Sequence, residues 1–272
     1  MGALPHPVTG LPVALTIAGS DSGGGAGIQA DLKVFMALGC HGASALTALT
    51  AQNTVGVTAI HEVPADFVGA QIDAVASDLG VAAAKTGMLA SAPIIEAVAD
   101  GLERHSIERL VVDPVFVSKH GNALLADDAV DALTKHVFPL ATVVTPNLHE
   151  ASAIVGYEVD SLSSMGAAAR ALHSLGPRSV LVKGGHLGTD RAIDVFFDGA
   201  EQVEIEGPRY DTEDTHGTGC ALSAAIAARL AHGDDLLAAV RFAKEFVSGA
   251  IDRSLRLGHG FGPVNPAWRL TL

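Results

Sequence analysis

Positive charge is scarce in this sequence. Its 272 residues include 17 Lys and Arg against 30 Asp and Glu, which gives a formal net charge of −13. Proteins that grip nucleic acid or an anionic membrane depend on Lys and Arg to neutralise phosphates. One Trp and two Tyr also offer few platforms for stacked bases. We therefore expect no nucleic-acid or membrane partner, and any anionic ligand must be held by a small local site.

Cysteines and long hydrophobic runs are also scarce. Cys40 and Cys220 are the only cysteines, and the first residues lack a basic segment followed by an apolar run. The longest apolar stretches, such as residues 221–231, fall short of the ~20 residues that a membrane-spanning helix needs. These absences predict a protein of the reducing cytoplasm.

Three common motifs are missing. The dinucleotide fingerprint G-x-G-x-x-G fails because Ile28 stands where its last Gly would be, and no G-x-x-x-x-G-K-[ST] phosphate loop occurs. Neither His61-Glu62 nor His149-Glu150 has a second His in the fourth position after the first, so no H-E-x-x-H zinc helix exists. Any phosphate chemistry must therefore use another kind of site.

Short β-type runs recur along the chain, each followed by a helical pattern. This alternation predicts a parallel sheet flanked by helices, in one domain over residues 12–272 with a flexible tail over residues 1–11. Asp198-Gly199 separates two later runs, 192–197 and 202–205, which predicts an antiparallel hairpin at the sheet edge. The parallel strands are expected at residues 13–18, 44–50, 82–85, 110–112, 142–145 and 179–182.

The helices between these strands have apolar residues at helical spacing. One face is expected to carry Ile28, Leu32, Phe35 and Leu38, and another Val68, Ile72, Val75 and Leu79. Two further helices are expected at residues 218–232 and 235–254. Between them, Gly233 is suited to end the first helix and Asp234 to cap the second.

Glycines and polar residues follow almost every expected strand. Because ligands of open parallel sheets bind beyond the carboxyl ends of the strands, this arrangement predicts a site at that edge. Residues 19–27 are Gly-rich and could either approach a ligand closely or form a plain turn. Residues 214–220 (D-T-H-G-T-G-C) precede an Ala-rich helix, so Thr215, Gly217, Thr218 and Gly219 could cradle a phosphoryl group. An ordinary helix cap from Asp214 or Thr215 is the alternative.

Four side chains in these positions suit phosphoryl transfer. Asp113 and Glu150 could share a hydrated Mg²⁺, and Lys183 could neutralise phosphate oxygens, although each could also serve only a turn, a helix start or the solvent. Cys220, in the first turn of a helix, could become a thiolate and act as a base. Its alternative role is that of a small buried apolar residue.

Taken together, these segments resemble the hydroxymethylpyrimidine and phosphomethylpyrimidine kinases of thiamine biosynthesis, which are ribokinase-like enzymes. The similarity runs from about residue 13 to 264, with Phe116 and His149 as modest departures. Several blocks in a fixed order are more specific than any single block. They are GSDSGGGAGIQADLK from Gly19, TAQNT from Thr50, KTGML from Lys85, DPV from Asp113, TPNLHE from Thr145, KGGH from Lys183, THGTGC from Thr215 and GHGFGPV from Gly258.

The resemblance implies a three-layer α/β/α fold, a homodimer, and transfer of the ATP γ-phosphoryl group to 4-amino-5-hydroxymethyl-2-methylpyrimidine and then to its monophosphate. It implies that Gln52 pairs with the pyrimidine ring, which a Gln amide can do through one donor and one acceptor. It further implies a pocket lined by Gly19, Asp31, Met88 and Val115. The remaining implied roles are Cys220 as catalytic residue with Gly217, Thr218 and Gly219 as anion hole, Lys183 on the ATP phosphates, and Asp113 with Glu150 for Mg²⁺.

Two other functions remain open at this stage. A vitamin B6 kinase of the same superfamily would phosphorylate pyridoxine or pyridoxal with the same fold and ATP site. A metabolite-binding protein without turnover would not need Lys183, Asp113, Glu150 and Cys220 together. For the adenine of ATP, the resemblance indicates only the region of residues 241–263.

Overall fold

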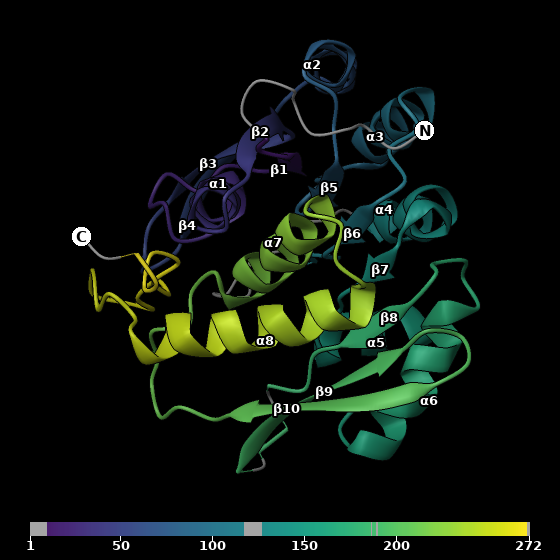
Figure 1. Cartoon of the computed structure of the whole chain (residues 1–272). Coiled ribbons are helices and arrows are strands. Elements are labelled where there is room, and N and C mark those ends of the chain that lie inside the picture. The colour runs from purple at the N-terminus through teal and green to yellow at the C-terminus, as the bar shows by residue number, and fades with distance from the viewer. Residues whose placement is uncertain (1–9, 117–126, 186, 189, 271–272) are drawn as a thin grey trace.

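The computed structural model describes residues 10–116, 127–185, 187–188 and 190–270. Its centre is an eight-stranded sheet in the order β10-β9-β8-β7-β6-β5-β1-β2 (Figure 1). The six strands from β8 to β2 are parallel to one another, whereas β9 is antiparallel to both of its neighbours, β8 and β10. The mostly parallel sheet expected from the sequence is thus confirmed. Most of the expected tail, residues 1–9, lies outside the described residues.

The strands of this sheet lie close to the expected positions. The expected hairpin at the sheet edge is formed by β9 and β10. The bounds are β1 Val13–Ala18, β2 His41–Leu46, β5 Ala83–Thr86, β6 Leu110–Val112, β7 Val143–Val144, β8 Val180–Val182, β9 Arg191–Phe197 and β10 Gln202–Pro208.

Helices cover both faces of the sheet, as Figure 1 shows. Because side chains alternate along a strand, Leu15 and Ile17 of β1 join the core beneath α2 to α6, while Ala14 joins the core beneath α1, α7 and α8. This is the expected three-layer α/β/α arrangement. The helices are α1 Gly27–Ala37, α2 Ala65–Asp78, α3 Ala92–Arg104, α4 Asp127–Ala132, α5 Leu148–Val155, α6 Leu162–His173, α7 Thr218–Ala231 and α8 Leu236–Asp252, with a π turn at Leu133–Val137 and a 3₁₀ turn at Phe138–Leu140.

The single strand expected over residues 44–50 is wrong. The chain leaves the main sheet at Thr47, and β3 (Ala48–Gln52) pairs instead with β4 (Val57–Glu62) in a separate two-stranded sheet. Thr47 makes the corner because its N–H donates to Ala18 O, its hydroxyl to Met88 O, and its carbonyl accepts from Val63 N. This corner carries Gln52 out over the carboxyl edge of the main sheet.

Three details of the helices also differ from the expectation. On α1, Asp31 and Val34 are buried, whereas Leu32 and Leu38 are only partly buried. On α2, Leu79 is 38% exposed because the helix has already ended. Asp235 and not Asp234 caps α8, with its carboxylate accepting from the N–H groups of Leu237 and Ala238.

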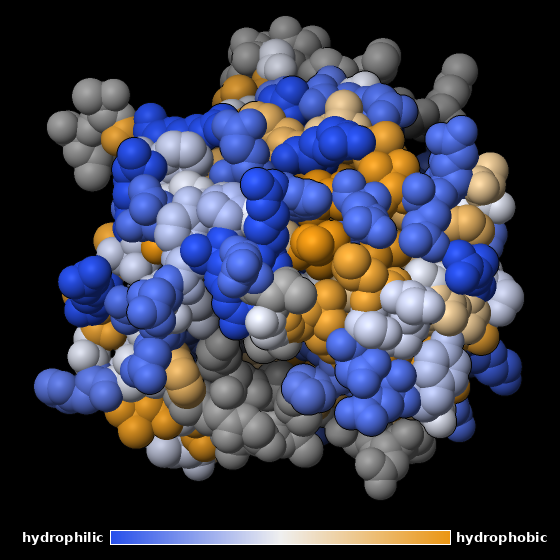
Figure 2. Space-filling view, turned by 90° about the horizontal axis from the view of Figure 1, so that it is seen from below, coloured by the Kyte–Doolittle hydropathy of each residue, from blue (hydrophilic) through white to orange (hydrophobic). Residues whose placement is uncertain are grey.

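The surface is mixed in character. Figure 2 shows the face seen from below, on which polar side chains cover much of the surface and hydrophobic ones gather in one area. No helix in the described parts of the chain has the length and apolar character needed to cross a membrane.

Candidate active site

The loop that follows β1 is organised by one carboxylate. Asp21 Oδ1 accepts from Gly23 N at 2.8 Å, and Asp21 Oδ2 accepts from Gly25 N at 3.0 Å and Ala26 N at 2.8 Å. His216 Nε2 lies 2.9 Å from the same Oδ2. Burial opposes ionisation of Asp21, but these hydrogen bonds, that of His216 first, lower its pKa below the usual value. Asp21 therefore ties this loop to the segment before α7.

The two Gly-rich segments fit into each other. A Cβ on Gly217 would overlap the carbonyl oxygen of Gly25, and a Cβ on Gly25 would overlap the ring of His216. Gly217 also has a φ of 80°, in the left-handed region that favours glycine. Glycine at these positions is thus required by contact between the loops.

The start of α7 is not closed by a side-chain cap. Gly217 is the N-cap residue and has no side chain. Asp214 instead accepts from Gly262 N, and Thr215 contributes its carbonyl oxygen to the Thr218 hydroxyl at 2.7 Å. The alternative of an ordinary cap from Asp214 or Thr215 is therefore wrong. Thr218 N donates to Thr215 O at 3.3 Å, so the next N–H groups, those of Gly219 and Cys220, are the ones that could bind an anion at the positive end of the helix.

Cys220 lies in this first turn, where Gly27 N–H donates to its sulfur. Burial raises the pKa of the thiol to about 11, with Lys85 acting against the rise and Asp31 and Asp113 adding to it. This direction is opposite to the thiolate-stabilising effect expected from the helix start, because burial outweighs the helix dipole. Without ligands, Cys220 is a protonated thiol at neutral pH.

Asp31 is held in a buried ion pair that the sequence did not reveal. Its Oδ2 lies 2.8 Å from Lys85 Nζ and accepts from the Thr16 hydroxyl at 2.6 Å, and neither charged side chain has exposed surface. Asp31 Oδ1 is buried without a hydrogen-bond partner, as is Thr86 Oγ1. Asp31 thus lies beneath the site and carries one free acceptor, which a ligand donor could use.

The other residues expected to bind substrate lie around the same edge. Gly19 lies against Met88, because a Cβ on Gly19 would be 3.2 Å from Met88 Sδ. Gln52 reaches toward the α7 segment, with its amide nitrogen 3.4 Å from His216 Nε2. Val115 is partly buried against the hydrophobic core and donates its N–H to Asp113 O. The segment that follows, residues 117–126, lies outside the described residues.

Lys183, Asp113 and Glu150 form a charged cluster. Lys183 Nζ lies 2.7 Å from Asp113 Oδ1 and 4.0 Å from Glu150 Oε2, and both carboxylates are nearly buried. A Cβ on Gly219 would be 3.4 Å from Lys183 Nζ and 3.5 Å from Asp113 Oδ2, so the cluster faces the first turn of α7. The structure therefore brings these three residues together with the proposed anion hole.

The two carboxylates differ in their protonation. Burial opposes ionisation of Asp113, yet Lys183 and Lys85 lower its pKa. Burial and the neighbouring Asp113 raise the pKa of Glu150 to about 7, although Lys183 acts against this. Glu150 also completes a capping box with Asn147 at the start of α5. Glu150 thus both caps the start of α5 and belongs to the charged cluster.

Within the described residues, no three His, Cys, Asp or Glu side chains gather as a metal site of their own. Asp113 and Glu150 nevertheless suit a hydrated Mg²⁺. Asp113 Oδ1 accepts from Lys183 and Thr145, and Glu150 Oε2 accepts from Asn147 N, which is compatible with an ion held through water molecules.

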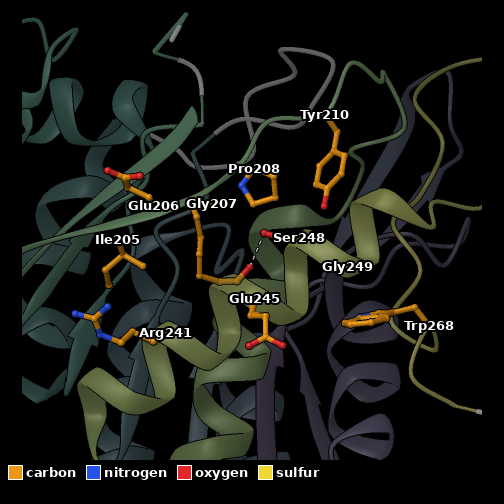
Figure 3. Close-up of a pocket in the computed structure, with 11 residues that line it drawn as sticks. Ile205, Glu206, Gly207, Pro208, Tyr210, Arg241, Glu245, Ser248, Gly249 and Trp268 are labelled. Carbon is orange, nitrogen blue, oxygen red and sulfur yellow. Dashed lines mark hydrogen bonds between the residues drawn. The ribbon is translucent and has the colours of Figure 1, made fainter. Parts of the chain in front are cut away.

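A hollow of about 470 Å³ lies between the end of β10 and helix α8 (Figure 3). Arg241 lies at one end of it and Trp268 at the other. Lys244 joins it to the charged cluster, since Lys244 Nζ donates to Asp194 Oδ2 at 2.7 Å and Asp194 Oδ1 accepts from Gly184 N at 2.9 Å. It is lined by Ile205, Glu206, Gly207, Pro208, Tyr210, Arg241, Lys244, Glu245, Ser248, Gly249 and Trp268.

Four residues of this edge had no role assigned from the sequence. Asp21, Lys85 and His216 all lie within the quoted motifs, but their partners lie far away in the chain, 195 residues in the case of Asp21 and His216. Asp194 lies in β9, where nothing in the pattern marks it. An aspartate inside a Gly-rich loop was the one available signal, because such residues often bind nearby N–H groups.

Comparison with known proteins extends this description. The hydroxymethylpyrimidine/phosphomethylpyrimidine kinase of Streptomyces coelicolor is 51% identical over 266 residues, covering 98% of each chain. The ADP complex of Bacillus subtilis pyridoxal kinase has a TM-score of 0.90 at 40% identity and covers 96% of this chain and 100% of its own. The phosphomethylpyrimidine kinase of Clostridium difficile has a TM-score of 0.78 at 40% identity and covers 88% and 99%.

These structures share the ribokinase-like arrangement expected above, and the family model for phosphomethylpyrimidine kinase matches residues 21–265. The matched region includes the charged cluster, the α7 start and Gln52. The chain therefore belongs to the phosphomethylpyrimidine kinase family.

Proposed function

We propose that this chain transfers the γ-phosphoryl group of ATP to the hydroxymethyl group of 4-amino-5-hydroxymethyl-2-methylpyrimidine, and then phosphorylates the monophosphate to the diphosphate, as a cytoplasmic enzyme of thiamine biosynthesis. The observation that carries this is the meeting of Gln52, the uncapped α7 start and Lys183 at one edge of the sheet. The family supports it, because its curated members are named for both steps.

The pyrimidine would lie between the β3 strand and α7. Gln52 would pair with the ring nitrogen and the amino group, and Gly19, Met88 and Val115 would line the pocket. The unpaired Asp31 Oδ1 would accept a hydrogen from the ligand. A buried acceptor that gains a donor removes a desolvation cost, so this contact would favour binding.

The hydroxymethyl oxygen would attack the γ-phosphorus as the bond from this phosphorus to the β,γ-bridging oxygen breaks, so that ADP leaves and the hydroxyl proton passes to the thiolate of Cys220. The N–H groups around Gly217, Thr218 and Gly219, with Lys183, would hold the negative charge of the transferred group. Because Cys220 starts as a thiol, it must first release its own proton to solvent, and Lys85 is the neighbour that favours this ionisation. Phosphoryl transfer relies mainly on positioning and charge stabilisation, so a modest base is sufficient.

Asp113 and Glu150 would hold Mg²⁺ through water. The ion, when bound, would neutralise charge on the ATP phosphates. A cation is also compatible with this pair, since it relieves the repulsion with Asp113 that helps to keep Glu150 protonated.

For ATP itself, we place the adenine in the hollow beside α8. Five of its lining residues, Arg241, Lys244, Glu245, Ser248 and Gly249, fall in the region indicated by the resemblance. Asp194 connects the hollow to Gly184, which is next to Lys183, so one nucleotide could use both. The relative from Bacillus subtilis was solved with ADP, which supports a nucleotide site in this fold.

Phosphorylation of pyridoxal is the second candidate. The structural similarity to the pyridoxal kinase of Bacillus subtilis favours it, since that TM-score of 0.90 exceeds the 0.78 found for the pyrimidine kinase of Clostridium difficile. The 51% identity to the Streptomyces coelicolor pyrimidine kinase favours the first candidate. We give the sequence identity more weight because the two activities share one fold.

We also propose a homodimer. The two-stranded sheet and the start of α2 expose apolar side chains on one part of the chain, namely Leu49, Val55, Ile60 and Phe67, each at least 41% exposed. Such exposed apolar surface is typical of an interface. Sedimentation of the purified protein at micromolar concentration tests this, and a monomer at every concentration would contradict it.

The activity is tested by ADP release with Mg-ATP and a panel of alcohols: the pyrimidine, its monophosphate, pyridoxal and pyridoxine. We expect the largest kcat/KM for the two pyrimidines. A larger value for pyridoxal would make the second candidate the main activity. Absence of ADP release with all four would leave only the binding-protein alternative.

A further inference from the structure

The side-chain amide of Gln52 lies between two polar neighbours. One end of it is 3.2 Å from the Thr50 hydroxyl and the other is 3.4 Å from His216 Nε2. An amide presents a carbonyl acceptor at one end and an N–H donor at the other. Which end faces which neighbour therefore decides what pattern Gln52 offers to a ligand.

His216 Nε2 must be a donor. It lies 2.9 Å from Asp21 Oδ2, a carboxylate that also accepts from the N–H groups of Gly23, Gly25 and Ala26. These hydrogen bonds and His216 itself lower the pKa of Asp21 against the effect of burial, so it is an ionised acceptor. The hydrogen between the two residues consequently belongs to His216, whether the ring is neutral or protonated.

The Thr50 hydroxyl can only accept from Gln52. Its single hydrogen is donated to Ser20 O at 2.8 Å. An amide nitrogen turned toward His216 would set two N–H groups against each other and would leave Thr50 with two acceptors for one hydrogen. Half a turn about the Cγ–Cδ bond of Gln52 removes the conflict at Thr50, because the NH₂ group then donates to it. It also turns the carbonyl oxygen toward His216 Nε2–H, whose one hydrogen is shared with the nearer Asp21 Oδ2.

His216 has no freedom to move away from this position. Its side chain is nearly buried, its ring touches Gly25, and its backbone pairs with Gly262 O and Val264 N. The segment GHGFGPV from Gly258 therefore holds His216 in place. This gives a structural role to a sequence motif that has no part in the proposed chemistry. The orientation of the Gln52 amide is built into the fold before any ligand binds.

We infer that His216, held by Asp21, is a positioning residue that keeps the carbonyl oxygen of Gln52 on the α7 side, so that the site selects a ring whose exocyclic amino group faces α7. This inference rests on the proposed function. In the proposed substrate the amino group and the hydroxymethyl group are on adjacent ring carbons. An amino group held on the His216 side thus directs the hydroxymethyl group toward the α7 start, which carries Cys220.

A ligand with the opposite pattern provides the test. The 4-oxo analogue of the pyrimidine has a ring N–H and a carbonyl oxygen in place of the ring acceptor and the amino group, so it matches only a reversed amide. Calorimetry without ATP would measure the dissociation constants of both alcohols for the wild-type protein, His216→Leu and His216→Gln. Gln can place a donor near the position of Nε2, whereas Leu cannot.

We expect the wild-type protein to prefer the amino compound. His216→Leu should reduce this preference about tenfold, the effect of one hydrogen bond, because the amide can then turn. His216→Gln should keep the preference within about threefold. Urea unfolding would show that each variant is folded. If His216→Leu is unfolded, Thr50→Val provides the second test, since it removes the acceptor at the other end of the amide and should reduce the preference likewise.

The outcomes separate the two claims. An unchanged preference in a folded His216→Leu or Thr50→Val variant would overturn the positioning role alone, with the proposed function intact. Equal losses in His216→Leu and His216→Gln would also overturn it, because shape and not donation would then be responsible. A wild-type protein that binds neither pyrimidine would overturn the proposed function and this inference with it.

Discussion

Lys85 Nζ lies 2.8 Å from Asp31 Oδ2, and neither side chain has any exposed surface. The pair lies beneath Cys220, where Lys85 lowers and Asp31 raises the pKa of the thiol. Burial opposes the charged form of Lys85, but Asp31 and the other nearby acidic groups hold its pKa above the usual value. A buried charge of this kind depends on its partner.

Lys85→Met should therefore destabilise the protein strongly. It leaves the Asp31 carboxylate buried without a counter-ion, which typically costs about 3–5 kcal/mol of unfolding free energy. The double variant Asp31→Asn/Lys85→Met removes both charges and should lose clearly less. Urea unfolding at pH 7 measures both. Equal losses in the single and double variants would show that the charge of Asp31 is not the cause.

The sequence predicted the sheet better than the site. The strand over residues 110–112 has its expected bounds because this apolar run contains two valines and is too short for a helix, which favours a buried strand. The corner at Thr47 could not be predicted, since it depends on hydrogen bonds to Ala18 and Met88 from distant strands. β4 was missed because its residues are mostly exposed and show no alternation of apolar and polar side chains.

The site shows the same division. Residue types after the strands pointed to Asp113, Glu150 and Lys183, and the fold places them together. The sequence could not show that burial raises the pKa of Cys220, because burial depends on how the whole chain packs. It also could not reveal the contact between Asp21 and His216.

Gly217→Ala tests the contact between the two Gly-rich loops. The new Cβ would meet the carbonyl oxygen of Gly25 at a left-handed residue, and we expect a loss of roughly 3 kcal/mol or more, which is the range for overpacking with backbone strain. Gly233→Ala is the matched control after the other end of α7. It also has a positive φ, of 92°, but no atom lies within 4 Å of the new Cβ.

The control should thus lose only about 1–2 kcal/mol, the cost of the left-handed conformation. The free energy of unfolding from urea titration of both variants provides the comparison. Similar values for Gly217→Ala and Gly233→Ala would mean that the loop segments can separate without loss, contrary to their close fit.

Glu150 should make the metal-free protein less stable as the pH rises. Its pKa is raised from 4.5 to about 7 by burial and by Asp113, so the folded chain binds this proton more tightly than the unfolded chain. The resulting stability is fully present below about 4.5 and is lost as the pH rises through about 7. Asp113 has a lowered pKa, so its own contribution changes at more acidic pH and leaves this window unaffected.

Glu150→Gln is the matched variant, because a Gln can still accept from Asn147 N in the capping box. Urea unfolding with EDTA at pH 5 and pH 8 would give the free energy of unfolding of both proteins. The stability of the wild type relative to the variant should fall between these two pH values. A rise over the same interval would mean that Glu150 is stabilised as a carboxylate by Lys183.

Cys220 should react slowly with iodoacetamide at pH 7 and faster as the pH rises. Its pKa of about 11 leaves only a small thiolate fraction at neutral pH, and that fraction grows about tenfold per pH unit. Cys40 serves as the internal control, because it is nearly buried and burial raises its pKa to about 12. Mass spectrometry of the alkylated peptides at pH 7 and pH 9 follows both residues.

The same residue should control turnover. Cys220→Ala is expected to lose ~100-fold in kcat, the usual cost of removing a well-placed proton acceptor. Cys40→Ala should retain the wild-type kcat, since Cys40 lies against Ala228 and His232 at the far end of α7. Rapid alkylation of Cys220 at pH 7 would show that the thiolate already exists in the free protein. A nearly normal kcat in Cys220→Ala would instead leave the α7 amides and Lys183 to carry the reaction without this base.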